Sequence, residues 1–146
     1  MAENNQLANT NVKDTLSQNS TTAYCSMKAA TMREKAMLYN AMANPTHRLG
    51  DYINVTIFVR DVYVELIELS DDLTGEVTMA PRIVLIDTGN ETFQAVSKGI
   101  YNSLSRLIQT FGEPTWEGGL PLKVKQVSLG KNQLLTLEAD LDAFTD

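Results

Sequence analysis

The strongest constraint on the fold is a long segment in which apolar and polar side chains alternate. Residues 55–59 read Val-Thr-Ile-Phe-Val, and the alternation resumes at Val62 with its phase shifted by one residue across Arg60 and Asp61. A period of two is typical of a strand with one buried face. A shift of one residue is what a β-bulge produces in a bent strand. The segment therefore predicts one long strand with a bulge at Arg60 and Asp61.

Turn-forming residues divide the following segment into further strands. Asp, Gly, Asn, Ser and Thr cluster at residues 70–75 and again at 87–90, and such residues favour tight turns. The apolar segments beside these turns, and a pair of segments nearer the C-terminus, read as strands. Their expected bounds are Val77–Asp87, Thr92–Val96, Leu122–Leu129 and Gln133–Ala139.

A helix is predicted between the third and fourth strands. Ser97 is a suitable N-cap, and Gly112 a suitable C-terminal stop. Apolar residues between them recur at helical spacing and form one stripe: Ile100, Leu104, Leu107, Ile108 and Phe111. The order of a bulged strand, two strands, a helix and a hairpin predicts an OB-fold, a mainly β, five-stranded antiparallel barrel. An open α+β sheet and an SH3-like barrel are the alternative folds.

The N-terminal part has a different composition. Residues 1–26 consist mostly of Asn, Gln, Ser and Thr and predict a flexible polar arm. Residues 27–43 have helical spacing and end before Pro45, so they predict an N-terminal helix. We therefore expect one OB-fold domain over residues 27–139, followed by an acidic tail over 140–146.

The charge distribution leaves a nucleic-acid partner open. The net charge of −6 argues, taken alone, against a non-specific nucleic-acid binder. However, residues 61–76 and 138–146 hold ten acidic residues and no basic one, so the rest of the chain carries a net charge of +4. Net charge therefore does not decide the partner.

The sequence argues against an enzyme. One Cys (Cys25) and one His (His47) exclude a disulfide framework and a zinc finger. No phosphate-binding, hydrolase or metalloprotease motif is present, and no cofactor is indicated. Asp61, Glu65 and Asp87 could in principle gather a metal for phosphodiester cleavage, but a solvated acidic face is the favoured interpretation. The chain also lacks a secretory signal and an apolar run of about 18 residues, which favours a reducing cytoplasm.

Residues typical of single-strand recognition are better represented. Such binding needs aromatic rings that stack on bases and cations that meet phosphates. If Ile57 and Val59 face the core, Phe58 and Arg60 face outward together. The candidate binding residues are Phe58, Arg60, Tyr63, Arg82, Phe93, Trp116, Lys123, Lys125 and Lys131.

The segment from Leu38 to Ala139 resembles the small single-stranded DNA-binding proteins of bacteriophages, of the OB-fold type. The resemblance rests on LYNAMANPTHRLGDYINVTIFVRDVYVE, on APRIVLIDTGNETFQAVSKGIYNSLSRLIQTFGEPTW and on PLKVKQVSLGKNQLLTLE. It implies sequence-tolerant coating of single-stranded DNA during phage replication or recombination, in the host cytoplasm and without a membrane. It does not fix which residues contact DNA.

Protein partners are the second expectation. The acidic end with Phe144 looks like the tails through which many single-strand-binding proteins recruit replication partners, although a solubilising terminus is the simpler interpretation. The Met-rich helix over 27–43 packs on its own domain or joins copies of the chain into a homo-oligomer. The alternative function is an OB-type protein-interaction module without nucleic-acid affinity, which the overall acidity favours.

Overall fold

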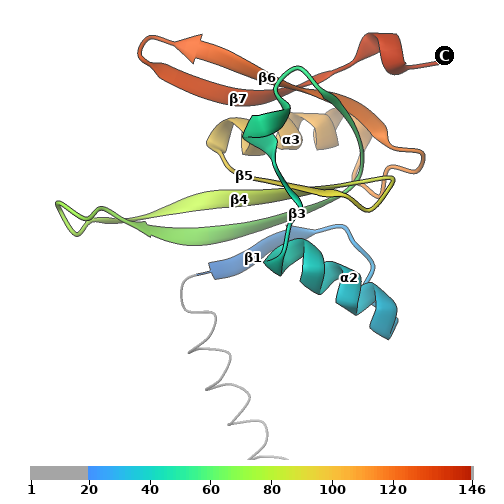
Figure 1. The fold of residues 1–146 in the computed structure, drawn as a ribbon, viewed down its shortest axis with the longest axis horizontal. Coiled ribbons are helices and arrows are strands. Elements are labelled where there is room, and N and C mark those ends of the chain that lie inside the picture. The colour runs from blue at the N-terminus through green and yellow to red at the C-terminus, as the bar shows by residue number, and fades with distance from the viewer. Residues whose placement is uncertain (1–19, 146) are drawn as a thin grey trace, which may run out of the picture.

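One strongly curled sheet forms the body of the described chain. The computed structural model describes residues 20–145. Within them, the strands of the sheet follow the order β2-β5-β4-β3-β6-β7. Strand β1 lies outside this order and pairs with β3 (Figure 1). The elements in chain order are β1 Ser20–Cys25, α2 Met32–Ala43, β2 His47–Arg48, the 3-10 turn η1 Leu49–Tyr52, β3 Thr56–Ser70, β4 Val77–Asp87, β5 Thr92–Val96, α3 Lys98–Phe111, β6 Leu120–Leu129, β7 Asn132–Ala139 and the 3-10 turn η2 Leu141–Ala143.

Strand β3 is the centre of the sheet and changes partners along its length. Its first residues pair with β6, from Thr56 opposite Lys123 to Val59 opposite Leu120. Its second half pairs with β1, and β4 lies along almost the whole strand. The register with β4 shifts between Val59 and Asp61, which confirms the bulge predicted at Arg60 and Asp61. The bulge bends β3 at the point where its partner changes.

The concave side of the sheet holds the main core. Ile57, Val59, Val62 and Val64 of β3 point into it, together with side chains of β4, β5 and β6. Helix α3 closes over this core with Ile100 and Leu104. As predicted, Ser97 caps α3, accepting a hydrogen bond from the Ile100 N–H, and the helix ends at Gly112.

The predicted OB-fold, a five-stranded antiparallel barrel, is only partly right. The mainly β class and the expected succession of strands around α3 are confirmed, but the sheet of the described residues has seven strands, and its edge strands β2 and β7 do not pair with each other. In the described chain the free edge of β7 meets α3 instead: the Leu137 N–H donates to the Ser103 Oγ at 3.1 Å. Gly99 permits this approach, because a Cβ there would lie 2.1 Å from the Leu135 carbonyl oxygen.

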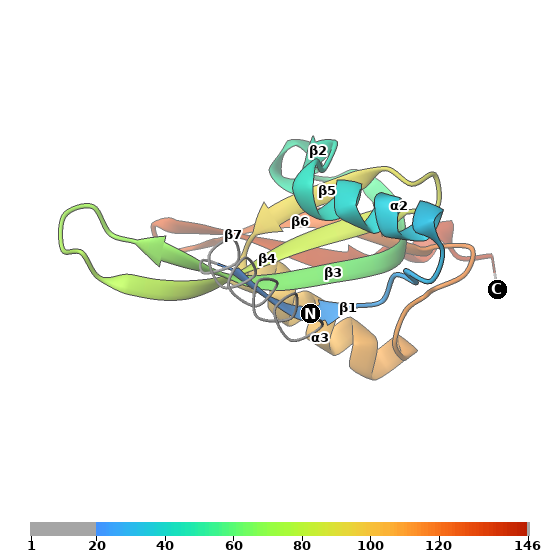
Figure 2. The same ribbon diagram turned by 90° about the horizontal axis from the view of Figure 1, so that it is seen from below.

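Helix α2 covers the opposite, convex side of the sheet. Ala41 packs with Tyr63, Val84 and Ile86 in a second, smaller core. Figure 2 shows α2 and α3 on opposite sides of β3 and β4. The helix starts at Met32, five residues later than predicted, because Thr31 and Glu34 form a reciprocal capping box that fixes its first turn.

Both ends of the described chain lie against the folded body. Of the polar arm expected over residues 1–26, residues 1–19 lie outside the described part, and Ser20–Cys25 form β1. These polar residues join the sheet through their backbone, and only Tyr24 reaches the main core. The acidic tail is also docked: Phe144 packs against the main core and stacks on Phe111 at 6.4 Å between ring centroids. Asp146 lies outside the described residues.

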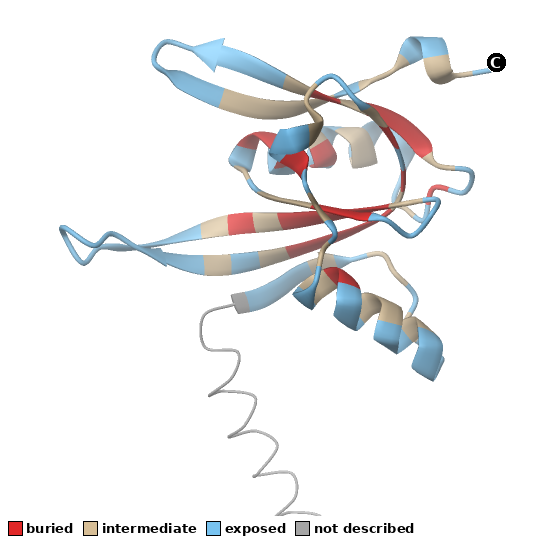
Figure 3. Cartoon of the chain, in the orientation of Figure 1, coloured by how far each residue is buried: buried red, intermediate tan, exposed pale blue. Residues whose placement is uncertain are grey.

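Two hairpins, β3–β4 and β6–β7, extend beyond the packed body. The longer one, formed by the ends of β3 and β4, projects from the sheet as an arm (Figures 1 and 2). Figure 3 shows that exposed residues fill the arm, whereas buried residues gather where the sheet curls. No helix of the described residues is long and apolar enough to cross a membrane.

Candidate nucleic-acid interface

Four of the predicted binding residues share one side of the sheet. Thr56 pairs with Lys123, and Phe58 pairs with Pro121. Paired residues of neighbouring strands point to the same side, and so do residues two apart along one strand. Lys123, Lys125, Phe58 and Arg60 therefore line one convex strip across β6 and the start of β3. We call these four residues the outer strip.

Phe58 is the accessible aromatic ring of the outer strip. It is 42% exposed, although its neighbours Ile57 and Val59 are buried. The loop before β6 presses on its base. Gly119 has a φ of 83°, and a Cβ there would lie 2.8 Å from both the Phe58 Cβ and the Thr88 Cγ2. The backbone of Gly119 therefore packs closely against the base of the Phe58 side chain, which remains partly exposed.

Arg60 is held in place by two side chains. Its Nε donates to the Asp61 Oδ2 at 3.0 Å, and its Nη2 donates to the Asn90 Oδ1 at 2.8 Å. Asp61 is nearly buried and also accepts hydrogen bonds from Ser26 Oγ at 2.9 Å and Thr115 Oγ1 at 2.6 Å. A guanidinium has further N–H donors, so Arg60 is positioned and can still contact an anion.

The two lysines lie among polar and acidic neighbours. Lys125 Nζ donates to the Asn54 Oδ1 at 3.0 Å. Lys123 lies opposite Glu138 in the register of β6 and β7. It also lies close to Asp140, whose pKa is lowered mainly by the hydrogen bond from Thr56 Oγ1 and further by the charge of Lys123. The outer strip is therefore a mixed surface with cations at both of its ends.

Three other predicted aromatic residues are buried. Tyr63 is 2% exposed beneath α2, and its hydroxyl donates to Glu65. Phe93 is 5% exposed and stacks on His47 with 4.8 Å between ring centroids. Trp116 is 9% exposed, and its Nε1 donates to the Gly112 carbonyl. In this structure none of the three offers a ring face to a base.

Two predicted cations also lie away from the outer strip. Arg82 is bound between Glu65, at 3.1 Å, and the Gln94 side chain, at 3.2 Å. Lys131 is exposed at the turn between β6 and β7. It is separated from Lys123 by most of the hairpin, about 20 Å at the rise of an extended strand.

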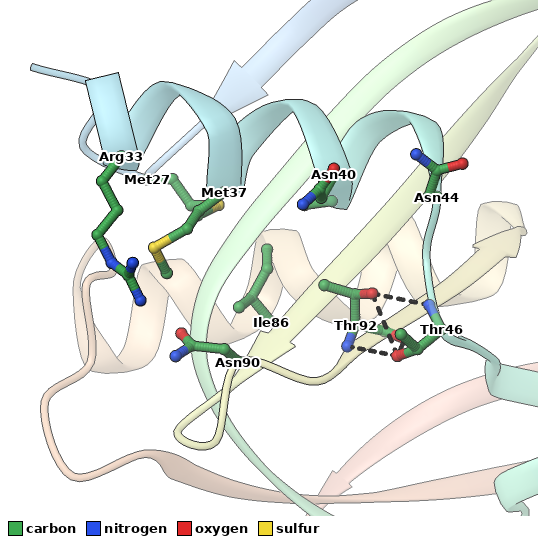
Figure 4. Close-up of a pocket in the computed structure, with 10 residues that line it drawn as sticks. Met27, Arg33, Met37, Asn40, Asn44, Thr46, Ile86, Asn90 and Thr92 are labelled. Carbon is green, nitrogen blue, oxygen red and sulfur yellow. Dashed lines mark hydrogen bonds between the residues drawn. The ribbon is translucent and has the colours of Figure 1, made fainter. Parts of the chain in front are cut away.

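A groove beside α2 was not predicted from the sequence. It encloses about 480 Å³ between the helix and the ends of β4 and β5. Figure 4 shows Arg33, Met37 and Asn40 on the helix facing Ile86 and Asn90 across this space. A smaller hollow of about 290 Å³ adjoins it and shares Met27 and Met37 with it. The signal in the sequence was the spacing of methionine and asparagine along α2, but the opposing wall comes from distant residues.

The acidic residues weighed as a metal site do not converge. Asp61 binds Ser26, Thr115 and Arg60, whereas Glu65 pairs with Arg82. Asp87 accepts hydrogen bonds from the N–H groups of its own turn. Within residues 20–145, no group of three or more His, Cys, Asp or Glu side chains is arranged to hold a metal ion.

Comparison with known proteins gives one match. A family model described as phage single-stranded DNA-binding protein matches residues 17–140, a range that runs from just before β1 to just after β7. No curated protein and no solved structure matches the chain.

Proposed function

The chain belongs to the phage single-stranded DNA-binding protein family, as the resemblance of residues 38–139 predicted, and on that premise we propose that the outer strip is its DNA-binding surface. Bases stack on Phe58, while Arg60, Lys123 and Lys125 meet the phosphates. The process it serves is replication or recombination of phage DNA in the cytoplasm of the infected cell. No catalytic step is part of the proposal.

The observation that carries this proposal is the exposure of Phe58 beside a positioned Arg60. Covering an exposed aromatic ring removes apolar surface from water, which is favourable. The flat face of a nucleobase has a suitable shape to cover it. Stacking on such a ring is worth about 1–3 kcal/mol per base and depends little on which base is bound. In a duplex the base faces are already stacked on one another, so the same ring favours single strands.

The cations of the outer strip set the expected dependence on salt. Each neutralised phosphate of a single strand contributes about −0.7 to the slope of log affinity against log salt. Arg60, Lys123 and Lys125 together predict a slope of about −2 on the same basis. The acidic neighbours Glu138 and Asp140 keep the cationic potential of the strip modest, so binding depends on stacking more than it would on a uniformly basic surface.

The direct test is a titration of labelled oligothymidine followed by fluorescence anisotropy, with duplex DNA of the same length as a control. Phe58→Ala is expected to weaken single-strand binding about fivefold or more, the lower end of one lost base stack. Phe111→Ala is the matched control, because Phe111 is similarly exposed, at 44%, but lies on α3. Equal affinities of the two variants would refute stacking on Phe58.

The phosphate contacts are tested separately. Lys125→Gln is expected to reduce the salt slope by about 0.7, the share of one phosphate. Lys98→Gln, at an exposed position of α3, is the control and should leave the slope unchanged. An unchanged slope in both variants would remove Lys125 from the interface. Absence of any single-strand binding by the unmodified protein at low salt would refute the function itself.

A further inference from the structure

The groove beside α2 is large and chemically mixed. Its volume of about 480 Å³ lies within the range of small-molecule sites, about 300–1,000 Å³. Met27, Met37 and Ile86 supply apolar surface, while Asn40, Asn44 and Asn90 supply side-chain amides. Figure 4 shows the two methionines and Asn40 on one wall, with Ile86 and Asn90 on the other. This combination offers apolar contact to a flat ring and hydrogen bonds to its edge.

The groove is joined to the outer strip by a direct contact. Arg60 lines the smaller adjoining hollow, and its Nη2 donates to the Asn90 Oδ1 in the wall of the groove. That bond occupies the amide oxygen of Asn90 and leaves its amide N–H groups free to donate. Arg33 lines the groove as well and provides a second cation beside it. A strand bound at Phe58 and Arg60 therefore arrives at the opening of the groove.

We propose that the groove receives one nucleobase of the bound strand, next to the base on Phe58, and that its asparagine amides make the affinity depend on which base enters. This inference rests on the proposed function and deepens it. The methionine sulfurs contact the face of the base, as thioethers do with aromatic rings. The Asn40 and Asn44 amides meet its exposed edge, where single-stranded bases carry unpaired donors and acceptors.

The first experiment compares oligothymidine and oligodeoxycytidine of equal length by competition against a labelled strand. The unmodified protein is expected to distinguish them by about fivefold, the lower end for one amide read of a base edge. Asn40→Ala should bring the ratio of the two affinities close to one. Asn102→Ala, an exposed asparagine on α3, is the control and should keep the original ratio.

A second experiment uses the unmodified protein, so it does not depend on how a variant folds. Methionine oxidation by dilute peroxide is followed by mass spectrometry, with and without saturating oligothymidine. Met37 should be protected by the oligonucleotide, whereas Met32 should oxidise at the same rate in both samples, because it is 81% exposed on the same helix outside the groove.

A matched pair of variants gives a third test. Met37→Ala should weaken binding about two- to tenfold, and Met32→Ala should not.

The outcomes separate this inference from the proposed function. If Phe58→Ala weakens binding but Met37 oxidises equally with and without DNA, the strip binds DNA and the groove does not. An unchanged ratio of affinities in Asn40→Ala likewise overturns the groove as a base-reading site. If the unmodified protein binds neither oligonucleotide, both the groove and the proposed function fail.

Discussion

Replacing Asp61 with alanine tests whether one buried carboxylate holds the bulge of β3 together. Asp61 is 5% exposed and accepts side-chain hydrogen bonds from three segments: Ser26 before α2, Arg60 in the bulge, and Thr115 in the loop before β6. The Ser26 Oγ in turn accepts from the Val62 N–H. Asp61→Ala removes the acceptor common to all three segments.

The expected loss of stability follows from these bonds. A hydrogen bond to a charged group contributes about 1.5–3 kcal/mol. The two hydroxyl bonds, from Ser26 and Thr115, give about 3 kcal/mol at the lower end of that range. The side chain of Arg60 is 25% exposed, so water replaces much of its contact and its pair with Asp61 adds only about 0–1 kcal/mol. We therefore expect Asp61→Ala to lower the free energy of unfolding by about 3–4 kcal/mol.

The assay is urea unfolding followed by Trp116 fluorescence, since Trp116 packs in the main core and its backbone N–H donates to the Arg60 carbonyl. With a slope of about 2 kcal/mol per molar urea, the midpoint should fall by about 1.5–2 M. Asp61→Asn is the control: it keeps an oxygen acceptor for both hydroxyls and should cost about 1 kcal/mol, the scale of an ordinary neutral hydrogen bond. A midpoint for Asp61→Ala within experimental error of the unmodified protein would refute this account of the bulge.

Three further predictions concern single sites. Gly99→Ala should lower stability by about 1–3 kcal/mol, because its Cβ would meet the Leu135 carbonyl oxygen at 2.1 Å; an unchanged urea midpoint would contradict the close contact of α3 and β7. Thr31→Ala removes the capping box of α2 and should lower the free energy of unfolding by about 1 kcal/mol. Relative to the unmodified protein, amide hydrogen exchange should become faster in α2 but not in α3. Burial raises the pKa of Tyr63 above its ordinary value of 10.0, so the folded state retains a proton that the unfolded state has lost, and stability falls as pH rises above about 10. Tyr63→Phe should lose less stability than the unmodified protein between about pH 9 and pH 11, and equal losses in urea midpoint would show that Tyr63 does not contribute.

Local signals in the sequence predicted much of the fold. The phase shift at Arg60 and Asp61 marked the bulge, since it records which side chains share a face. Turn residues marked the bounds of β4 and β5, and Ser97 and Gly112 marked the ends of α3. Strand β1 has no such signal, because its polar residues join the sheet through backbone hydrogen bonds rather than through a buried apolar face.

The site was harder to predict because alternation does not say what covers a face. Phe58 and Tyr63 both lie on the convex side of β3, but α2 covers Tyr63 and leaves Phe58 exposed. Phe93 is buried by contacts with His47 and Tyr52, which come from β2 and η1. These coverings depend on contacts between residues far apart in the chain, which spacing along the sequence does not encode.

The projecting arm of β3 and β4 gives the molecule a charge dipole. Residues 65–76 of the arm contain five acidic residues and no basic one, while the cations of the outer strip lie near the opposite end of β3. A polyanion that drifts toward the arm is repelled, and one that approaches the strip is not. The electrostatic field of the protein therefore favours encounters at the strip before any contact forms. This sorting weakens as added salt shortens the Debye length. Added salt also screens the repulsion from the arm, so the association rate constant for single-stranded DNA should fall with ionic strength more steeply in a variant whose arm has been neutralised.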